Sequence, residues 1–145
     1  MLPKIKFQIT TPEKIAFQDE VEAVSLPTEN GEITILAHHI PLVTNLVPGE
    51  IIIKKDMEKI SLAVSGGLVQ VNAASEVLVL ADTAEHALEI DLQRAEEARL
   101  RAQEMLQEKK EDAEDYALLS AKLQKELVRL KVAKKHHSKK INLDD

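Results

Sequence analysis

The chain changes its composition abruptly near residue 88, and this change limits the folds that it can adopt. All five prolines and all four glycines lie at or before Gly67. Residues 1–87 contain 25 Val, Ile and Thr residues, whereas residues 88–145 contain four. β-Branched residues favour strands, and segments rich in Ala, Leu, Glu, Lys and Arg favour helices. We therefore predict a β domain at residues 1–87 and an α-helical domain at residues 88–145.

The first domain contains a series of short β-rich runs separated by turn residues. Ile5, Phe7 and Ile9 fall on one face of a strand, because alternate residues of a strand point the same way. The segments KISLAV, EITIL, EIIIKK, GLVQV and EVLVLA are similar, and LPTENGE, VPGE and SGG separate several of them as turns. Eight to ten short strands with little helix predict a β-sandwich or a flattened barrel.

The second domain shows helical periodicity in two apolar stripes. The first is mostly alanine and the second has larger residues: Ala95, Ala98, Ala102 and Met105, then Tyr116, Leu119, Leu123, Leu127 and Leu130. Spacings of three and four residues place each set on one face of a helix. Short links favour antiparallel neighbours, so we predict a two-helix hairpin. The hairpin is expected to be weak, because each buried CH2-sized group contributes only about 0.8 kcal/mol.

The charges are distributed unevenly along the chain, whose net charge is −6. Residues 1–115 carry 11 basic and 22 acidic side chains, whereas residues 116–143 carry eight basic residues and the single acid Glu126. A basic C-terminal helix indicates an acidic partner. A helix that lysines merely keep soluble explains the same charges, and the charge pattern leaves both interpretations open.

Several classes of function are disfavoured by what the sequence lacks. Without cysteine there is no disulfide, zinc–thiolate site or thiol nucleophile. Neither a phosphate-binding glycine loop nor a nucleophile elbow occurs, and the scarcity of aromatic residues disfavours base stacking. Four of the five histidines form the adjacent pairs His38-His39 and His136-His137, whose members point in different directions and so make poor metal ligands. No leader or membrane-spanning run is evident, so we expect a soluble intracellular chain that meets a membrane only through another protein.

One constellation in the helical domain has the chemistry of a nucleotide site. If a helix starts near Asp91, then Arg94, Glu97 and Arg101 project on successive turns. Lys125 and Arg129 share a face of the second helix because they are four residues apart. Arginine forks suit phosphate oxygens, and carboxylates such as Glu85 and Asp91 suit the exocyclic amine of adenine. Surface ion pairing, for instance of Glu97 with Arg101, explains the same spacing and is favoured by spacing alone.

Four stretches of the chain resemble the epsilon subunit of bacterial F-type ATP synthase, in that family's order. They are LPTENGEITILAHHIPLVTNLVPGE at residues 26–50, SGGLVQV at 65–71, VLADTAE at 79–85 and IDLQRA at 90–95. The resemblance spans essentially the whole chain. It implies a β-sandwich followed by a two-helix hairpin, the same organisation that the composition predicts.

The resemblance also implies a function and a set of partners. It implies a non-catalytic rotor subunit of the central stalk, on the cytoplasmic face of the bacterial inner membrane, that binds the gamma subunit and rests on the c-subunit ring. Glu32 and His39 match family positions at the ring contact. The helices would fold against the sandwich, or extend into the catalytic head and inhibit ATP hydrolysis. The basic residues that would meet the beta subunit there are Lys122, Lys125, Arg129 and Lys131.

In some members of this family ATP binds the folded hairpin as a regulatory ligand. The motif that the resemblance assigns to ATP is I/L-D-x-x-R-A, present here as Ile90, Asp91, Arg94 and Ala95. Matching positions add Glu85, Arg101, Lys125 and Arg129. Lys125 stands where such members have arginine, which keeps the charge but loses the bidentate fork. No cofactor is required, and no metal is implied.

Two other functions are compatible with the residues alone. A generic adaptor or chaperone built from a β-sandwich and a coiled coil explains the composition and the basic helix, and it needs no nucleotide. A metal-dependent enzyme that uses the histidines is the weaker alternative. Co-purification with a gamma subunit and a c ring would separate the rotor subunit from the adaptor.

Overall fold

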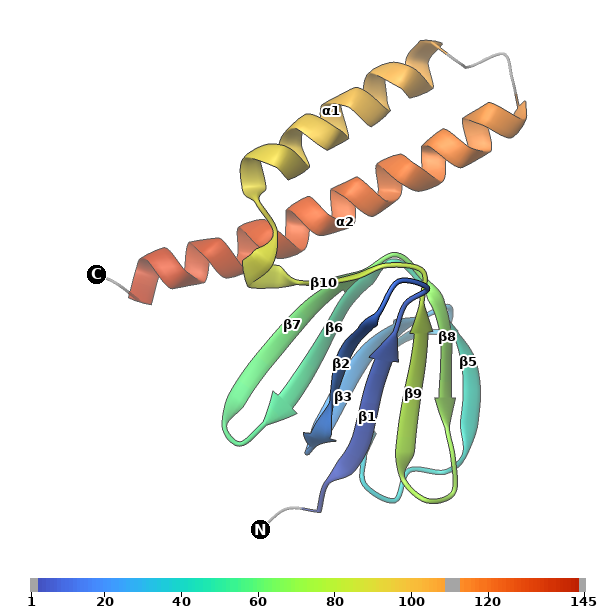
Figure 1. Ribbon diagram of the computed structural model, residues 1–145, viewed down its shortest axis with the longest axis vertical. Coiled ribbons are helices and arrows are strands. Elements are labelled where there is room, and N and C mark those ends of the chain that lie inside the picture. Colours follow the sequence, from blue (N-terminus) through green and yellow to red (C-terminus); the bar gives the residue numbers. More distant parts are fainter. Residues whose placement is uncertain (1–2, 109–112, 144–145) are drawn as a thin grey trace. The chain divides into compact units, whose positions relative to one another are not determined.

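The fold is described from a computed structural model, which describes residues 3–108 and 113–143, with the side chains of the second helix described from 114 to 137. The chain divides into two compact units at the boundary between His86 and Ala87. The first unit consists of strands and the second of helices (Figure 1). The predicted order of a β-sandwich followed by a helical hairpin is therefore confirmed.

The first unit contains ten short strands, in agreement with the predicted eight to ten. Their bounds are β1 Ile5–Thr10, β2 Ile15–Val21, β3 Ala23–Thr28, β4 Gly31–Leu36, β5 Leu42–Leu46, β6 Gly49–Lys55, β7 Glu58–Val64, β8 Gly67–Val71, β9 Glu76–Ala81 and β10 Ala84–His86. Ile5, Phe7 and Ile9 of β1 are buried while Lys6 between them is exposed. The alternation in the sequence thus corresponds to an inner and an outer face.

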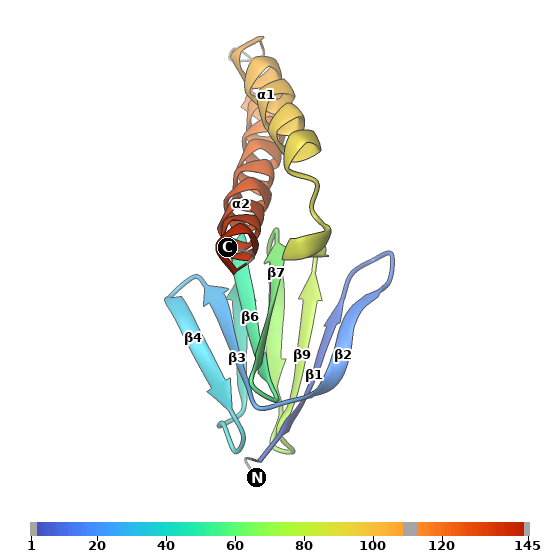
Figure 2. The same cartoon turned by 90° about the vertical axis from the view of Figure 1, so that its left-hand side faces the viewer.

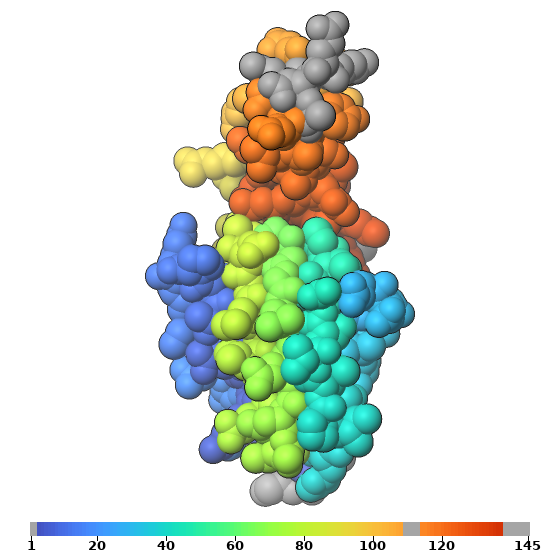
Figure 3. Space-filling model, turned by 90° about the vertical axis from the view of Figure 1, so that its right-hand side faces the viewer, coloured from blue at the N-terminus to red at the C-terminus, as the bar shows by residue number. Residues whose placement is uncertain are grey.

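The strands form one continuous sheet that folds over on itself. Its order is β10-β7-β6-β3-β5-β8-β9-β1-β2, and β4 branches off as a partner of β3. The β1–β9 pair is parallel and the other pairs are antiparallel. Figure 2 shows β4 at the margin beside β3, and Figure 3 shows the face on which β9, β8 and β5 lie next to one another.

The interior of the sheet is filled by aliphatic side chains and one aromatic pair. The ring centroids of Phe7 and Phe17 lie 5.9 Å apart in a tilted arrangement, and Phe7 is almost fully buried. The buried cluster consists of Ile5, Phe7, Ile9, Val21, Val24, Leu26, Ile35, Leu46, Ile51, Ile53, Leu62, Val64, Val69, Val71, Val77, Val79, Ala81 and Ala84. Burial of this apolar surface is the main stabilisation of the sandwich.

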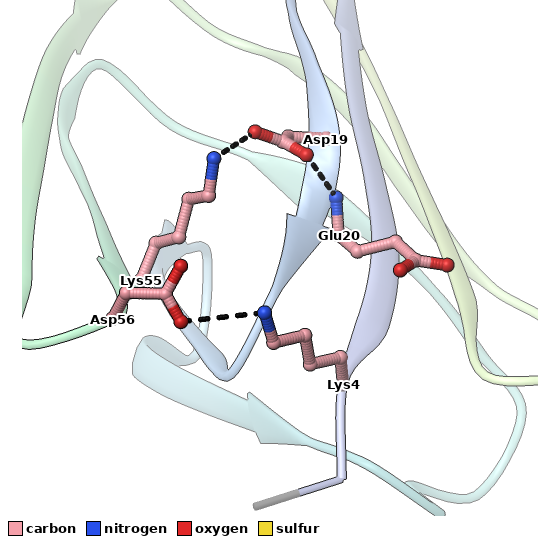
Figure 4. Close-up of polar contacts among 5 residues, drawn as sticks. All are labelled: Lys4, Asp19, Glu20, Lys55 and Asp56. Carbon is pink, nitrogen blue, oxygen red and sulfur yellow. Dashed lines mark hydrogen bonds and ion pairs between the residues drawn. The ribbon is translucent and has the colours of Figure 1, made fainter.

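Two ion pairs lie on the surface of the sandwich, and one of them joins β2 and β6, which are not neighbours in the sheet. The Lys55 ammonium on β6 binds the Asp19 carboxylate on β2, and Lys4 Nζ lies 3.3 Å from Asp56 Oδ1 (Figure 4). The backbone N–H of Glu20 also donates to Asp19 Oδ1 over 2.8 Å. The hydrogen bond from Lys55 is the main reason that the pKa of Asp19 falls below its ordinary value, and the same bond raises the pKa of Lys55.

Gly67, the first residue of β8, is a position that only glycine can occupy without rearrangement. Its φ of +145° is rarely adopted by residues with a side chain, and a Cβ at this position would collide with the Leu80 carbonyl oxygen. The close approach occurs because Gly67 pairs with Ala81 on β9. The turn predicted at SGG therefore includes a tight contact between two backbones.

The second unit is a hairpin of two helices preceded by a single 3-10 turn. The turn η1 spans Ala87–Glu89, and the helices are α1, Leu92–Glu108, and α2, Ala113–Leu143. Ala95 and Ala102 of α1 are buried, as predicted, but Met105 is 44% exposed. The small buried residues let the two helix backbones pack closely.

The predicted apolar stripe of α2 is partly wrong. Tyr116 and Leu127 are exposed, whereas Glu126, Leu130 and Ala133 are buried. Positions 119, 123, 126, 130 and 133 follow one another at alternating steps of four and three residues, which keeps them on the face toward a partner helix. Leu127 follows positions 119 and 123 by two successive steps of four residues, and this spacing places it to one side of the buried face. Tyr116 lies in the first turn of α2, at the end of the hairpin.

Candidate functional site

The predicted nucleotide motif begins at the N-terminus of α1, where Asp91 caps the helix. The backbone N–H of Arg94 donates to Asp91 Oδ1 over 3.1 Å, and the N–H of Ala95 donates to the Asp91 carbonyl oxygen over 2.9 Å. A side-chain oxygen that accepts from the third residue of the helix is the usual N-cap arrangement. The Asp91 residue as a whole is exposed. The helix starts where the spacing predicted.

The apolar members of the motif anchor this cap. Ile90 is 2% exposed and Ala95 is fully buried. The Ile90 carbonyl oxygen accepts a hydrogen bond from His137 Nε2 on α2 over 3.2 Å. The start of α1 is therefore held against α2 by both packing and a hydrogen bond. The contact of His137 with the motif could not be predicted from the sequence, because its partner is a backbone carbonyl oxygen, which no sequence motif specifies.

The charged side chains of α1 divide into a paired set and an exposed set. Arg99 binds the Glu96 carboxylate, with 3.1 Å between Arg99 Nε and Glu96 Oε1, and its Nη1 donates to Gln103 Oε1 over 3.0 Å. The hydrogen bond from Arg99 is the main cause of the lowered pKa of Glu96, and the positive charge of Lys134 on α2 lowers it further.

The ion pair of Glu97 with Arg101, which spacing alone favoured, does not form among the described residues. Arg94 and Arg101 are both exposed. Their guanidinium groups are therefore accessible to an anion from solvent.

The predicted cations of α2 have different surroundings. Lys122 and Lys131 are exposed and Lys125 is half-buried. Arg129 is partly buried, and its Nη1 donates to Glu126 Oε2 over 2.6 Å. Glu126 is a buried acidic residue that contacts Arg129, the residue predicted to bind phosphate. Neither the apolar pattern nor the charge pattern of the sequence predicted that Glu126 lies on the buried face of α2.

One residue of the predicted nucleotide site, Glu85, belongs to the first unit. Glu85 is on β10, opposite Ala63 of β7, and is half-buried in the sandwich. The predicted ligands thus come from both units. Within the helical unit, the fold joins Asp91, Arg94 and Ala95 through the helix cap.

The two residues predicted to contact a ring of subunits lie at opposite ends of β4. Glu32 is near the beginning of the strand and exposed, and His39 follows its end. Four residue steps separate Glu32 from Leu36, which corresponds to about 13 Å of extended chain. A surface that includes both residues therefore runs along β4 rather than forming one spot.

The loop around His39 is ordered by hydrogen bonds and exposes apolar side chains. The His38 N–H donates to Ser75 Oγ over 3.1 Å, and His39 Nδ1 donates to the Ile40 carbonyl oxygen over 2.7 Å. Leu36, Ile40 and Val43 are between 57% and 74% exposed. These three exposed apolar side chains fall within eight residues of the sequence, on either side of His39.

Among the side chains that the structure describes, no three His, Asp or Glu residues gather into a possible metal site. Over residues 3–108 and 113–143, neither helix is both long enough and apolar enough to cross a membrane.

Comparison with protein families finds two matches, in the order of the two units. The beta-sandwich domain of the ATP synthase Delta/Epsilon chain matches residues 4–87, and the long alpha-helix domain of the same chain matches residues 89–134.

Individual proteins are similar over nearly the whole chain. The ATP synthase epsilon chain of Chloroflexus aggregans is 45% identical over 136 residues, which cover 94% of this chain and 96% of that one. That of Syntrophobacter fumaroxidans is 40% identical over 135 residues, covering 93% and 99%.

Two solved structures are similar in fold. A chain in a cryo-EM structure of the Euglena gracilis mitochondrial ATP synthase, which includes OSCP, F1 and the c-ring, has a TM-score of 0.72 at 25% identity. The match covers 86% of this chain and 78% of that one. A chain in a structure of the central stalk and c-ring of the Tetrahymena thermophila mitochondrial ATP synthase matches with a TM-score of 0.53 at 17% identity, covering 61% and 70%.

Proposed function

Because the chain belongs to the ATP synthase Delta/Epsilon family, we propose that it is a non-catalytic subunit of the central stalk, which couples proton-driven rotation to ATP synthesis. The observation that carries the proposal is that both family domains match in order and together span nearly all of the chain. The subunit works as a mechanical and regulatory part, attached peripherally to the cytoplasmic face of the membrane through the rest of the complex.

The sandwich is the docking unit in this proposal. Its partners are the gamma subunit and the c-subunit ring, with Glu32 and His39 at the ring. The exposed side chains of Leu36, Ile40 and Val43 beside His39 support a protein-binding role for this region, since they offer apolar surface that a partner can bury. The hydrogen bonds of His38 and His39 hold the loop in place before a partner arrives.

The helical unit is the inhibitory part. When the helices extend into the catalytic head, the cations of α2 meet an acidic segment of the beta subunit, and ATP hydrolysis is inhibited. The exposure of Lys122 and Lys131 and the partial exposure of Lys125 and Arg129 support this role. Opposite charges steer such an encounter and fix its register.

ATP acts as a regulatory ligand of the folded hairpin. The exposed side chains of Arg94 and Arg101 are accessible to phosphates, and the exposed Asp91, whose Oδ1 caps the helix, is accessible to the adenine amine. The other residues of this site are Glu85, Ile90, Ala95, Lys125 and Arg129. The mechanism is one of linkage: a ligand that binds only the folded form stabilises it by about 2.7 kcal/mol at a hundredfold excess over Kd. Falling ATP then frees the helices and promotes inhibition.

The proposal is tested by reconstitution with an F-type ATP synthase from which the epsilon subunit has been removed. We expect the added chain to co-purify with the gamma subunit and the c ring, to restore coupling, and to lower ATP hydrolysis. Failure to associate with either partner would favour the generic adaptor instead.

Nucleotide sensing needs a separate measurement on the isolated chain. Paired labels on α1 and α2 report the distance between the helices while ATP is added, with Arg94→Ala as the control. We expect millimolar ATP to make the wild-type hairpin more compact and to have less effect on the variant. No compaction would reject sensing while leaving the assignment to the central stalk intact.

A further inference from the structure

Glu126 occupies a position in the helical unit where the pattern of the helix calls for an apolar residue. It lies between Leu123 and Leu130 on the buried face of α2, and only 5% of its surface is exposed. A buried carboxylate is costly unless a cation and hydrogen bonds compensate it. Arg129 provides that compensation, through the 2.6 Å hydrogen bond from Nη1 to Glu126 Oε2.

The ion pair between Glu126 and Arg129 occupies the guanidinium group that, in the proposed function, binds phosphate. The Arg129 side chain is 21% exposed and that of Glu126 is 7% exposed, so Arg129 is the more accessible member of the pair to an anion from solvent. Carboxylate and phosphate bind the same planar set of N–H donors. A phosphate that approaches Arg129 therefore meets a cation whose charge is already balanced by a neighbour three residues away.

We propose that Glu126 is an internal competitor for the phosphate groups of the nucleotide, and that its carboxylate keeps the nucleotide affinity of the helical unit low. When phosphate binds, Arg129 exchanges the carboxylate for a phosphate oxygen, and Glu126 loses its cation in a buried place. The repulsion between Glu126 and phosphate is also strong there, because little water screens it. Glu126 thus sets the ATP concentration to which the hairpin responds, without contacting the ligand. This inference rests on the proposed nucleotide site.

The test compares variants of the full-length chain by calorimetric titration with ATP and, separately, with inorganic tripolyphosphate. Glu126→Gln keeps the shape and an acceptor oxygen for Arg129 but removes the charge, and we expect it to lower the Kd for both ligands at least about tenfold. Glu126→Ala removes the charge with a good helix former, and we expect the same direction. Glu126→Asp keeps the charge, so its Kd should stay near the wild-type value.

Two controls separate competition from a change in net charge or in folding. Glu104→Gln makes the same change in charge at an exposed position of α1, and it should leave the affinity unchanged. In an Arg129→Ala background, Glu126→Gln should give no gain, because the competition requires the guanidinium group. Far-UV circular dichroism verifies that each variant retains its helices.

Each outcome decides between the two proposals. Tighter binding by Glu126→Gln supports the competitor even if the wild-type chain binds too weakly to measure, a result that would count against nucleotide sensing in the natural chain. If the wild type binds and Glu126→Gln binds equally or more weakly, the competitor is rejected and the nucleotide site stands. If neither chain binds either ligand, both proposals fail.

Discussion

The backbone N–H of Arg94 donates a hydrogen bond to Asp91 Oδ1 over 3.1 Å, so the two charged residues of the I-D-x-x-R-A motif are joined through the helix cap and not through an ion pair. Both Arg94 and Asp91 are exposed, and the cap uses only one of the two carboxylate oxygens of Asp91. Asp91 therefore has two separable roles. One oxygen stabilises α1, and the other is available to a ligand.

Substitutions of Asp91 should separate these roles. We expect Asp91→Ala to lose the cap and to destabilise the first turn of α1 by about 1 kcal/mol. Asp91→Asn keeps an oxygen for the Arg94 N–H but presents an amide donor where the nucleotide site needs an acceptor, so it should retain the helix and lose ATP affinity. Hydrogen exchange of the α1 amides reports the first effect and calorimetry with ATP the second. Unchanged ATP affinity in Asp91→Asn would remove Asp91 from the proposed ligands.

Alanine substitutions of Gly67 and Gly31 compare the effect of a close backbone contact on the stability of the sandwich. Both have positive φ, but a Cβ at Gly67 meets the Leu80 carbonyl and a Cβ at Gly31 meets nothing within 4 Å. We expect Gly67→Ala to lower the free energy of unfolding by roughly 2–5 kcal/mol, from backbone strain and overpacking together. Gly31→Ala should cost about 1–2 kcal/mol, from strain alone. Urea unfolding measures both, and equal losses would contradict the close backbone contact at Gly67.

The ion pair between Asp19 and Lys55 makes stability depend on pH in a predictable direction. Because the pKa of Asp19 is lowered from 3.8 in the folded chain, the unfolded chain binds a proton first as the pH falls. The contribution of Asp19 is therefore present at neutral pH and is lost as the pH falls through its lowered pKa. Lys55, whose pKa is raised above 10.5, contributes at neutral pH and loses its contribution as the pH rises through its raised pKa.

The measurement is urea unfolding of Asp19→Asn and the wild type at pH 7 and pH 3. We expect the variant to be less stable at pH 7 and the difference to shrink at pH 3. Glu13→Gln, at an exposed turn position, is the control and should show no such pattern. A difference that is the same at both pH values would mean that Asp19 acts by packing and not by charge.

Short-range features of this chain could be predicted from the sequence, because they depend on residues a few positions apart. The alternation of Ile5, Phe7 and Ile9, the helix start at Asp91 and the alanine face of α1 all belong to this group. The order of sandwich and hairpin followed from the change in composition.

Features that depend on the packing of distant segments could not be predicted in this way. The hydrogen bond of His137 to the Ile90 carbonyl joins positions 47 residues apart. Glu126 is buried and its neighbour Leu127 is exposed, because the buried face of α2 passes through position 126. Hydropathy alone predicts the reverse, with the leucine buried. The pairing of Arg99 with Glu96, in place of Arg101 with Glu97, likewise depends on which side of α1 faces Lys134.

The corrected apolar face of α2 predicts opposite behaviour for two leucines three residues apart. Leu130 is 6% exposed and Leu127 is 46% exposed. Leu130→Ala should remove buried contacts and cost about 2–5 kcal/mol, whereas Leu127→Ala should cost little, because alanine is also the better helix former. In a hairpin held by alanine contacts such a loss is enough to separate the helices. Paired labels on α1 and α2 should therefore show a longer distance in Leu130→Ala and no change in Leu127→Ala. The reverse result would restore Leu127 to the buried face and contradict the position of Glu126.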